Sequence, residues 1–325
     1  MKFVIAFVSL VLACSVHLSV SKDAALEVVS KHGQLSVRGV DIVDENGEKV
    51  QLKGMSLFWD VWMPQYYNNE SIYGIHDYCH SNVVRAAVSV VTEEDGGYIE
   101  TPDESLERLY AVVDAAIEDD IYVIIDWHDH IADQHTNYSL EFFDIVSKKY
   151  SGFPNIIYET FNEPTGQSWN DVLKPYHEAV IQAIRANDPD NIIVVGTPTW
   201  SQSVDQAANN PITGYDNIMY TLHFYAGTHK QWLRDTATNA LNSGLPIFVT
   251  EYGTVNADAT DPVDEPESRL WWDWLDEHNI SYVNWAISDK LEGASALVAN
   301  TTSLEVCQED FLTESGRLVV AQNKA

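Results

Sequence analysis

Short runs of apolar residues rich in Val, Ile and Tyr alternate along the chain with longer stretches in which apolar positions recur at helical spacing. The short runs predict eight strands, over residues 50–55, 83–87, 122–126, 156–159, 192–196, 218–222, 247–250 and 282–286. The longer stretches predict helices between them, over 102–118, 140–149, 169–186, 230–241 and 267–277. A hairpin over 35–43 is expected before the first strand.

The alternation of strands and helices predicts a fold class. Strands joined by helical crossovers pair in parallel. Eight such units favour a closed α/β barrel, the (β/α)8 TIM barrel, and we expect one domain over residues 22–325. An open doubly wound sheet is the main alternative, but it usually carries a glycine-rich first turn, which this sequence lacks.

The first residues follow a different pattern. A positive charge at Lys2 precedes an almost unbroken apolar run over 3–13 and then small residues. This order predicts a secretory signal peptide over residues 1–21, because the run is shorter than the ~20 residues of a membrane span. A lipoprotein cleavage site over 11–14 is the alternative. The sequence therefore predicts a secreted, extracellular protein.

The charge balance limits the partners. The chain carries 49 acidic and 18 basic residues, a formal net charge of −31. Nucleic acids and anionic membranes are therefore excluded as partners, since both bind basic faces. A neutral polymer such as a polysaccharide is compatible with this surface, and we expect a monomer.

Polar and aromatic residues gather where the predicted strands end. In a (β/α)8 barrel the carboxyl ends of the strands form the face that carries the chemistry. The residues at or just after these ends include Arg85, Asp126, Trp127, His128, Asn162, Glu163, His223, Tyr225, Glu251 and Trp285. A random scatter of polar residues would not follow strand ends in this way.

Two of these residues have the chemistry of glycoside hydrolysis. That reaction uses one carboxyl group to protonate the leaving oxygen and another to attack or stabilise the anomeric carbon. Glu163 and Glu251 follow strands four and seven, on opposite sides of the barrel mouth. Asn162 can donate to a sugar hydroxyl. Arg85 and Tyr225 are donors that would hold Glu251 ionised, while its negative charge would raise the pKa of the other carboxyl.

The run over 158–164, Tyr-Glu-Thr-Phe-Asn-Glu-Pro, resembles the acid/base signature of glycoside hydrolase family 5. The surrounding runs resemble the bacterial and invertebrate cellulase branch of that family. They occur in the same order over 51–56, 84–87, 125–128, 199–202, 223–229 and 248–253. The likeness covers nearly all of the chain after the predicted signal peptide.

The resemblance implies a role for each matching residue. Glu163 would be the acid/base and Glu251 the nucleophile. The sugar being cleaved would be surrounded by Arg85, His128, Asn162, His223, Tyr225 and Trp285. Contacts on the non-reducing side would come from Trp62, Lys290 and Glu292, and Trp200 would be a stacking platform on the leaving-group side. Many relatives carry a histidine three residues after the Met of the Gly-Met-Ser run; here that position is Phe58, so a polar contact to sugar would be lost.

The implied activity is endo-acting hydrolysis of internal β-1,4 bonds in cellulose and related β-glucans by retaining double displacement. Neither a cofactor nor a metal is expected. The same machinery acting on mannan, xyloglucan or mixed-linkage glucan remains an alternative. A non-catalytic carbohydrate-binding barrel is another, although such proteins normally lack one of the carboxylates.

Three further patterns concern a metal site, the packing of a helix and a disulfide. The sequence His128-Asp129-His130 is also typical of metal hydrolases, but no later Asp and His complete such a set. The tryptophans over 271–274 are expected to pack against the barrel. Cys79 and Cys307 would remain after signal cleavage, and a pair in an exported protein suggests a disulfide. Their expected places, near the floor and after a top loop, leave that bond open.

Overall fold

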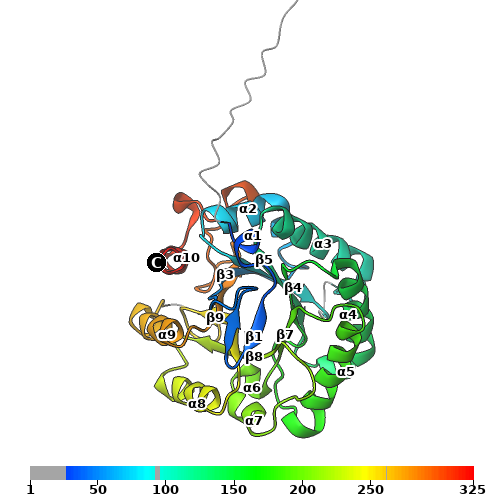
Figure 1. The fold of residues 1–325 in the computed structure, drawn as a ribbon. Helices are drawn as coiled ribbons and strands as arrows, with labels where there is room; N and C mark the ends of the chain where they lie inside the picture. Colours follow the sequence, from blue (N-terminus) through cyan, green and yellow to red (C-terminus); the bar gives the residue numbers. More distant parts are fainter. Residues whose placement is uncertain (1–26, 92–95, 261) are drawn as a thin grey trace, which may run out of the picture.

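Parallel strands form a closed barrel in the computed structural model, which describes residues 27–91, 96–260 and 262–325. Within these residues the barrel has eight strands in the order β10-β3-β4-β5-β6-β7-β8-β9 (Figure 1). They are β3 (Lys53–Leu57), β4 (Val83–Ser89), β5 (Tyr122–His128), β6 (Ile156–Glu159), β7 (Ile192–Val195), β8 (Ile218–Tyr225), β9 (Ile247–Gly253) and β10 (Tyr282–Ile287). The predicted (β/α)8 barrel is confirmed; the predicted signal peptide lies outside the described residues.

Helices surround the barrel on its outer side (Figure 1). The long ones are α2 (Asn69–Asp77), α3 (Pro102–Glu118), α4 (Thr136–Tyr150), α5 (Lys174–Arg185), α8 (Gln231–Asn242), α9 (Glu265–Glu277) and α10 (Glu314–Asn323). Short ones are α1 (Val29–His32), α6 (Pro198–Ser201) and α7 (Val204–Asn209), and β1 (Ser36–Arg38) pairs with β2 (Asp41–Val43) in the entry hairpin. None of the described helices is long and apolar enough to cross a membrane.

Short turns of other helix types complete the connections. Turns of 3-10 helix are η1 (Pro64–Tyr66), η2 (Ala132–His135), η4 (Ser303–Glu305) and η5 (Glu309–Phe311), and η3 (Trp169–Leu173) is a π-helical turn. The helix predicted over 169–186 is therefore divided between η3 and α5. Lys174 begins α5, and Pro175 occupies its first turn, where a missing N–H is tolerated.

Several strands extend further towards their carboxyl ends than the apolar runs predicted. β4 and β5 stay paired through Ala87↔Asp126 and Ser89↔His128. The first barrel strand instead begins later than predicted, at Lys53, because the N–H of Leu52 donates to Oγ of Ser281 at 2.8 Å and not to a strand. The candidate residues that lie within these strands, such as Arg85 and His128, are thus held by the pairing of their strands, whereas Asn162 and Glu163 follow the end of β6.

The tryptophans of α9 pack inwards, as predicted. Trp271, Trp272 and Trp274 are buried, and Trp271 stacks on Phe224 of β8 with ring centroids 3.8 Å apart. Nε1 of Trp271 also donates to the carbonyl of His229 at 2.9 Å. Helix α9 therefore supports the loop that follows β8 as well as the barrel wall.

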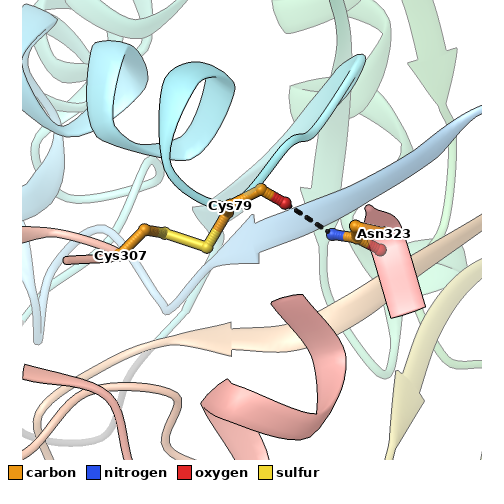
Figure 2. The surroundings of a disulfide bond; sticks show 3 residues. All are labelled: Cys79, Cys307 and Asn323. Carbon is orange, nitrogen blue, oxygen red and sulfur yellow. Dashed lines mark hydrogen bonds between the residues drawn. A yellow bond between two sulfur atoms is a disulfide. The ribbon is translucent and has the colours of Figure 1, made fainter. Parts of the chain in front are cut away.

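The disulfide that the sequence left open is present between Cys79 and Cys307 (Figure 2). Cys79 follows α2, and its carbonyl accepts a hydrogen bond from Nδ2 of Asn323 in α10 at 3.2 Å. The chain after β10 does not stay above the barrel: it runs against α2, close enough that a Cβ on Gly74 would lie 2.6 Å from the carbonyl oxygen of Val306. This path brings Cys307 to Cys79.

Candidate active site

Glu163 and Glu251 face each other at the carboxyl ends of the barrel strands. Glu163 follows β6, and Glu251 lies within β9. A carboxylate oxygen of each and a ring nitrogen of His223 all lie within 4.8 Å of one another. With Trp200 and Tyr225 among its other lining residues, the pocket they share has a volume of about 230 Å³. The structure thus brings together the carboxyl groups that the sequence placed after strands four and seven.

Arg85 lies beneath Glu251 and is fully buried. Its Nη1 donates to Oε2 of Glu251 at 3.2 Å, and its Nε donates to Oε2 of Glu159 at 2.7 Å. Its Nη2 lies 2.6 Å from Oδ1 of Asn162 and 3.0 Å from Oδ2 of Asp126. A buried guanidinium is tolerated when its donors are matched by carboxylates in this way. Burial lowers the pKa of Arg85, but the charges of Asp126, Glu159 and Glu251 together raise it by more than burial lowers it. Arg85 therefore stays charged.

Both oxygens of Glu251 accept hydrogen bonds. Oη of Tyr225 donates to Oε1 at 2.8 Å, and Arg85 donates to Oε2. The pKa of Glu251 is nevertheless raised, first by burial and then by the charge of Glu163, against the lowering effect of His223, Arg85 and Tyr225. The expectation that its donors would give Glu251 a lowered pKa was therefore wrong, because burial outweighs them.

Glu163 is held by imidazole rings. Nδ1 of His223 lies 2.9 Å from Oε1 of Glu163, and Nε2 of His130 lies 3.3 Å from Oε2. Burial alone would raise the pKa of Glu163, but the hydrogen bonds and charges of His130 and His223 lower it to about 2. Burial lowers the pKa of His223, yet Glu251, Glu159 and Glu163 raise it to about 9. The proton of this pair thus lies on His223, one hydrogen bond away from Glu163.

Other predicted residues form an aromatic wall beside the carboxylates. The rings of His128 and Trp285 stack with centroids 5.1 Å apart and planes 6° apart. Trp59 meets His128 edge-on at 4.3 Å and lies 4.8 Å from Trp62, whose side chain is 44% exposed. Nδ1 of His128 lies 2.6 Å from Oδ2 of Asp126, and burial followed by the charge of Arg85 lowers the pKa of His128. His128 is therefore neutral.

Lys290 and Glu292 lie beyond this wall and pair with each other. Nζ of Lys290 is 2.6 Å from Oε2 of Glu292 and lies over the ring of Phe58, 5.4 Å from its centroid. Phe58 in turn packs 5.1 Å from Trp285. The aromatic ring at position 58 is thus built into the wall, where it supports a cation and offers no polar group.

Trp200 lines the pocket together with Glu163 and Glu251. Thr199, Trp200 and Ser201 all have positive φ angles, which non-glycine residues adopt rarely and which persist where the surrounding structure holds them. The N–H of Trp200 donates to the carbonyl of Pro164 at 2.8 Å, and Oγ of Ser201 donates to the carbonyl of Asn162 at 2.8 Å. The indole is 47% exposed. This loop therefore fixes an exposed indole to the segment that carries Glu163.

The side chains of the histidine pattern after β5 do not converge on one point. His128 contacts Asp126, Asp129 contacts His135 at 2.6 Å, and His130 contacts Glu163. Among the residues that the structure describes, the group whose donor atoms do converge is Glu163, His223 and Glu251. Those atoms are already engaged with Arg85, Tyr225 and one another.

The barrel and its pocket match a known protein family. The family described as "Cellulase (glycosyl hydrolase family 5)" matches residues 43–291. The chain belongs to glycosyl hydrolase family 5. The match begins at the last residue of β2 and ends just after β10, so the family 5 region contains the whole barrel and the pocket at its mouth.

Relatives of this family 5 chain carry endoglucanase names. Endoglucanase Z of Dickeya dadantii is 46% identical over 289 residues, which cover 88% of this chain and 65% of the relative. An endoglucanase of Clostridium saccharobutylicum is 43% identical over 291 residues, covering 88% and 64%. The chain therefore spans just under two thirds of the length of these relatives.

Solved structures also resemble this family 5 barrel. A structure from Cytophaga hutchinsonii has a TM-score of 0.89 and 49% identity, covering 91% of this chain and 96% of that one. The catalytic domain of Thermobifida fusca endoglucanase Cel5A has a TM-score of 0.85 and 28% identity, covering 92% and 100%. A structure of that Thermobifida domain in complex with cellotetraose is similar to the same extent.

Three residues of the family 5 pocket were assigned no catalytic or sugar-binding role from the sequence, although Asp126 ends a predicted strand and His130 belongs to the histidine pattern. Glu159 accepts from Arg85 and, through Oε1, from Oγ1 of Thr250 at 2.6 Å; Thr250 in turn contacts Nε2 of His223 at 3.0 Å. The remaining two are Asp126 and His130. A signal was available for Glu159 and Asp126, since each ends an apolar strand, where a buried charge requires a partner.

Proposed function

We propose that this chain is a retaining endo-β-1,4-glucanase that cleaves internal bonds of cellulose and related β-glucans. Membership of family 5 and the endoglucanase names of the relatives support this proposal. The observation that carries it is the facing pair Glu163 and Glu251, whose oxygens lie within 4.8 Å. Retaining glycosidases hold these groups about 5–5.5 Å apart, whereas inverting enzymes leave about 6.5–9.5 Å for a water.

Glu251 is proposed as the nucleophile. Tyr225 and Arg85 fix both of its oxygens, so attack on the anomeric carbon requires little reorientation. In the first step the carboxylate of Glu251 forms a bond to the anomeric carbon as the glycosidic C–O bond breaks. The electron pair of that bond leaves with the glycosidic oxygen, which takes a proton from Glu163.

Glu163 is proposed as the acid and then the base. Glu163 has imidazole partners at 2.9 Å and 3.3 Å, and transfer of a proton from such a partner gives a protonated Glu163 beside a neutral imidazole without changing the net charge of the pair. Substrate that displaces water strengthens the repulsion between Glu163 and Glu251, which favours this form. In the second step Glu163 accepts a proton from water as the oxygen of that water replaces Glu251 on the sugar.

Asn162 is oriented for the sugar by Arg85. Because its Oδ1 accepts from Nη2 of Arg85 at 2.6 Å, its amide N–H groups remain to donate to a substrate hydroxyl. A contact to the 2-hydroxyl that strengthens in the transition state would lower the barrier.

The exposed indoles are proposed as sugar platforms. Trp62 lies beside Trp59 in the aromatic wall, Trp200 lines the pocket with Glu163 and Glu251, and each is almost half exposed, which suits stacking on the apolar face of glucose. His128 and Trp285 would surround the sugar being cleaved, and the Lys290–Glu292 pair offers charged hydrogen-bond partners beyond Phe58.

The enzyme is proposed to act outside the cell. The signal-peptide pattern over residues 1–21 supports export. The Cys79–Cys307 disulfide supports it independently, since such bonds persist in oxidising compartments.

Product stereochemistry and nucleophile rescue test the mechanism. NMR of the first products from cello-oligosaccharides should show the β-anomer before mutarotation; an initial α-anomer contradicts retention.

Glu163→Ala acting on an aryl cellobioside should be rescued by azide to give the β-glycosyl azide, because glycosylation at Glu251 still occurs. Glu251→Ala should give the α-azide by direct attack, and the reverse pattern would exchange the two roles. Both variants should lose on the order of 10³-fold or more activity on cellulose.

A polysaccharide panel tests the substrate. Carboxymethylcellulose should lose viscosity faster than reducing ends appear, as endo-acting cleavage requires. Higher activity on mannan, xyloglucan or mixed-linkage glucan than on carboxymethylcellulose would replace the polymer while leaving the mechanism in place.

A further inference from the structure

His130 contacts the same carboxylate as His223 but from the solvent side. Nε2 of His130 lies 3.3 Å from Oε2 of Glu163, and its side chain is 42% exposed. Nδ1 of His223 lies 2.9 Å from Oε1, and its side chain is only 2% exposed. Each oxygen of Glu163 thus has its own imidazole partner, one buried and one open to water.

The oxygens of Glu163 are therefore not equivalent. His223 is fixed from behind, because its Nε2 contacts Oγ1 of Thr250, which donates to Glu159. Oε1 is held on this buried side, whereas substrate enters from the open side. Oε2 is consequently the oxygen that can face a glycosidic oxygen, and His130 is the group in contact with it.

The backbone that carries His130 is tied to the segment that carries Glu163. The N–H of Glu163 donates to the carbonyl of Asp129 at 3.3 Å, and Nε2 of Gln167 donates to the carbonyl of His130 at 3.1 Å. The carboxylate of Asp129 is held in turn by His135 at 2.6 Å. The backbone of His130 is thus held beside the segment that carries Glu163.

We propose, resting on the proposed function above, that His130 is a positioning residue that carries the catalytic proton to and from Oε2 of Glu163. In the first step the proton on Nε2 of His130 moves to Oε2 of Glu163. It then passes to the glycosidic oxygen, which keeps the electron pair of the breaking C–O bond while Glu251 bonds to the sugar. In the second step Oε2 takes a proton from the attacking water and returns it to His130, from which it exchanges with solvent.

The charges around His130 favour this role. Glu163, Glu251 and Asp129 face its ring, and the hydrogen bond to Glu163, opposed by burial, is the main cause of its raised pKa. The ring of the neutral His128 lies 6.5 Å away. Because His130 and Glu163 interact directly, they titrate as a pair, and the apparent pKa at which the pair loses its proton belongs to both groups. His130 therefore extends the pH range over which Glu163 can act as an acid.

Leaving-group dependence separates a proton carrier from a structural residue. The test compares kcat/KM of His130→Asn with wild type on 2,4-dinitrophenyl cellobioside, phenyl cellobioside and cellotetraose. The dinitrophenyl group departs without protonation, so that rate should stay within about threefold. The other two substrates should lose on the order of 10²-fold, and the basic limb of the pH profile should move down by about one pH unit. His130→Gln is the second variant, and unfolding temperature checks that both are folded.

His135→Asn is the matched control, since it disturbs the same loop through Asp129 without touching Glu163. It should leave the leaving-group pattern and the basic limb in place. Equal losses on all three substrates, or an unmoved basic limb in a folded His130 variant, would overturn the proposal. Glu163→Ala must show the steep leaving-group dependence in the same assay; if it does not, the acid/base assignment itself has failed, not only the role of His130.

Discussion

At the scale of single residues, Glu163 and His223 form a buried pair of opposite charges joined by one hydrogen bond. If either group became neutral, the charge of the other would lose its partner. The carboxyl of Glu163 has a pKa of about 2, and the imidazole of His223 has a pKa of about 9. Each shift stabilises the folded state relative to the unfolded chain. The two groups therefore link stability to pH in opposite directions.

The sign of each contribution follows from the direction of its shift. The Glu163 pKa lies below the ordinary value of 4.5, so its contribution is full above pH 4.5 and is lost as the pH falls towards 2. The His223 pKa lies above the ordinary value of 6.5, so its contribution is full below pH 6.5 and is lost as the pH rises through 9. The stabilisation by the pair is thus greatest between pH 4.5 and 6.5.

We expect Glu163→Gln to change the pH dependence of stability. The unfolding temperature of the wild type should exceed that of the variant by the largest amount near pH 5.5. This difference should shrink as the pH rises from 6.5 to 9.5, because His223 loses its proton in the wild type. Calorimetric scans across this range measure the effect. A difference that does not vary with pH would mean that His223 is already neutral at pH 5.5.

The residues of the pocket differ in how well sequence could predict them. Glu163 and Glu251 follow apolar strand runs, so their convergence at the barrel mouth could be predicted from topology. The contact of His130 with Glu163 depends on the path of the loop after β5, which no periodicity describes. The raised pKa of Glu251 depends on how completely the pocket is buried, which emerges only from packing.

At the scale of elements, the strands and the helices α3, α4, α5, α8 and α9 were predictable because their apolar spacing reports directly which side is buried, whereas no range was predicted for α2 or α10. The helix over 102–118 agrees with α3, where Pro102 occupies the first position and Asp103 and Glu104 the first turn. The positive φ angles of the Trp200 loop and the return of the chain to α2 were not predictable. Both depend on contacts between segments far apart in sequence.

Substitution of Gly74 tests how closely the chain after β10 packs against α2. Alanine in a helix interior is normally about 1 kcal/mol more favourable than glycine. In α2 its Cβ would lie 2.6 Å from the carbonyl of Val306, so we expect Gly74→Ala to lower the free energy of unfolding by about 1–3 kcal/mol. Urea denaturation measures the change. Gly166→Ala is the control, since its Cβ meets nothing within 4 Å and should cost less than about 0.5 kcal/mol. An equally or more stable Gly74 variant would contradict this packing.

At the scale of the whole molecule, the net charge of −31 destabilises the folded state, because the excess carboxylates repel one another. Surface carboxylates repel one another over a distance that salt shortens, to about 8 Å at physiological ionic strength. The network around Arg85 is buried and is therefore screened much less. Salt should thus relieve the repulsion at the surface without weakening the pocket.

We expect the unfolding temperature to rise by a few degrees between 10 mM and 0.5 M NaCl, with kcat/KM on a neutral cello-oligosaccharide unchanged within about twofold. Calorimetry and initial rates measure the two quantities, and equal osmolality from sucrose controls for excluded volume. A falling unfolding temperature would show that attractive surface ion pairs dominate the repulsion.

The Cys79–Cys307 bond joins positions 228 residues apart, so most of the chain lies inside one covalent loop. Strands β4 to β10 lie within that loop and β3 lies outside it. A protease that cuts any peptide bond between the cysteines does not divide the molecule: both pieces stay attached, and the strands on either side of the cut remain paired with their neighbours. A fragment can leave only after a second cut or after reduction of the disulfide.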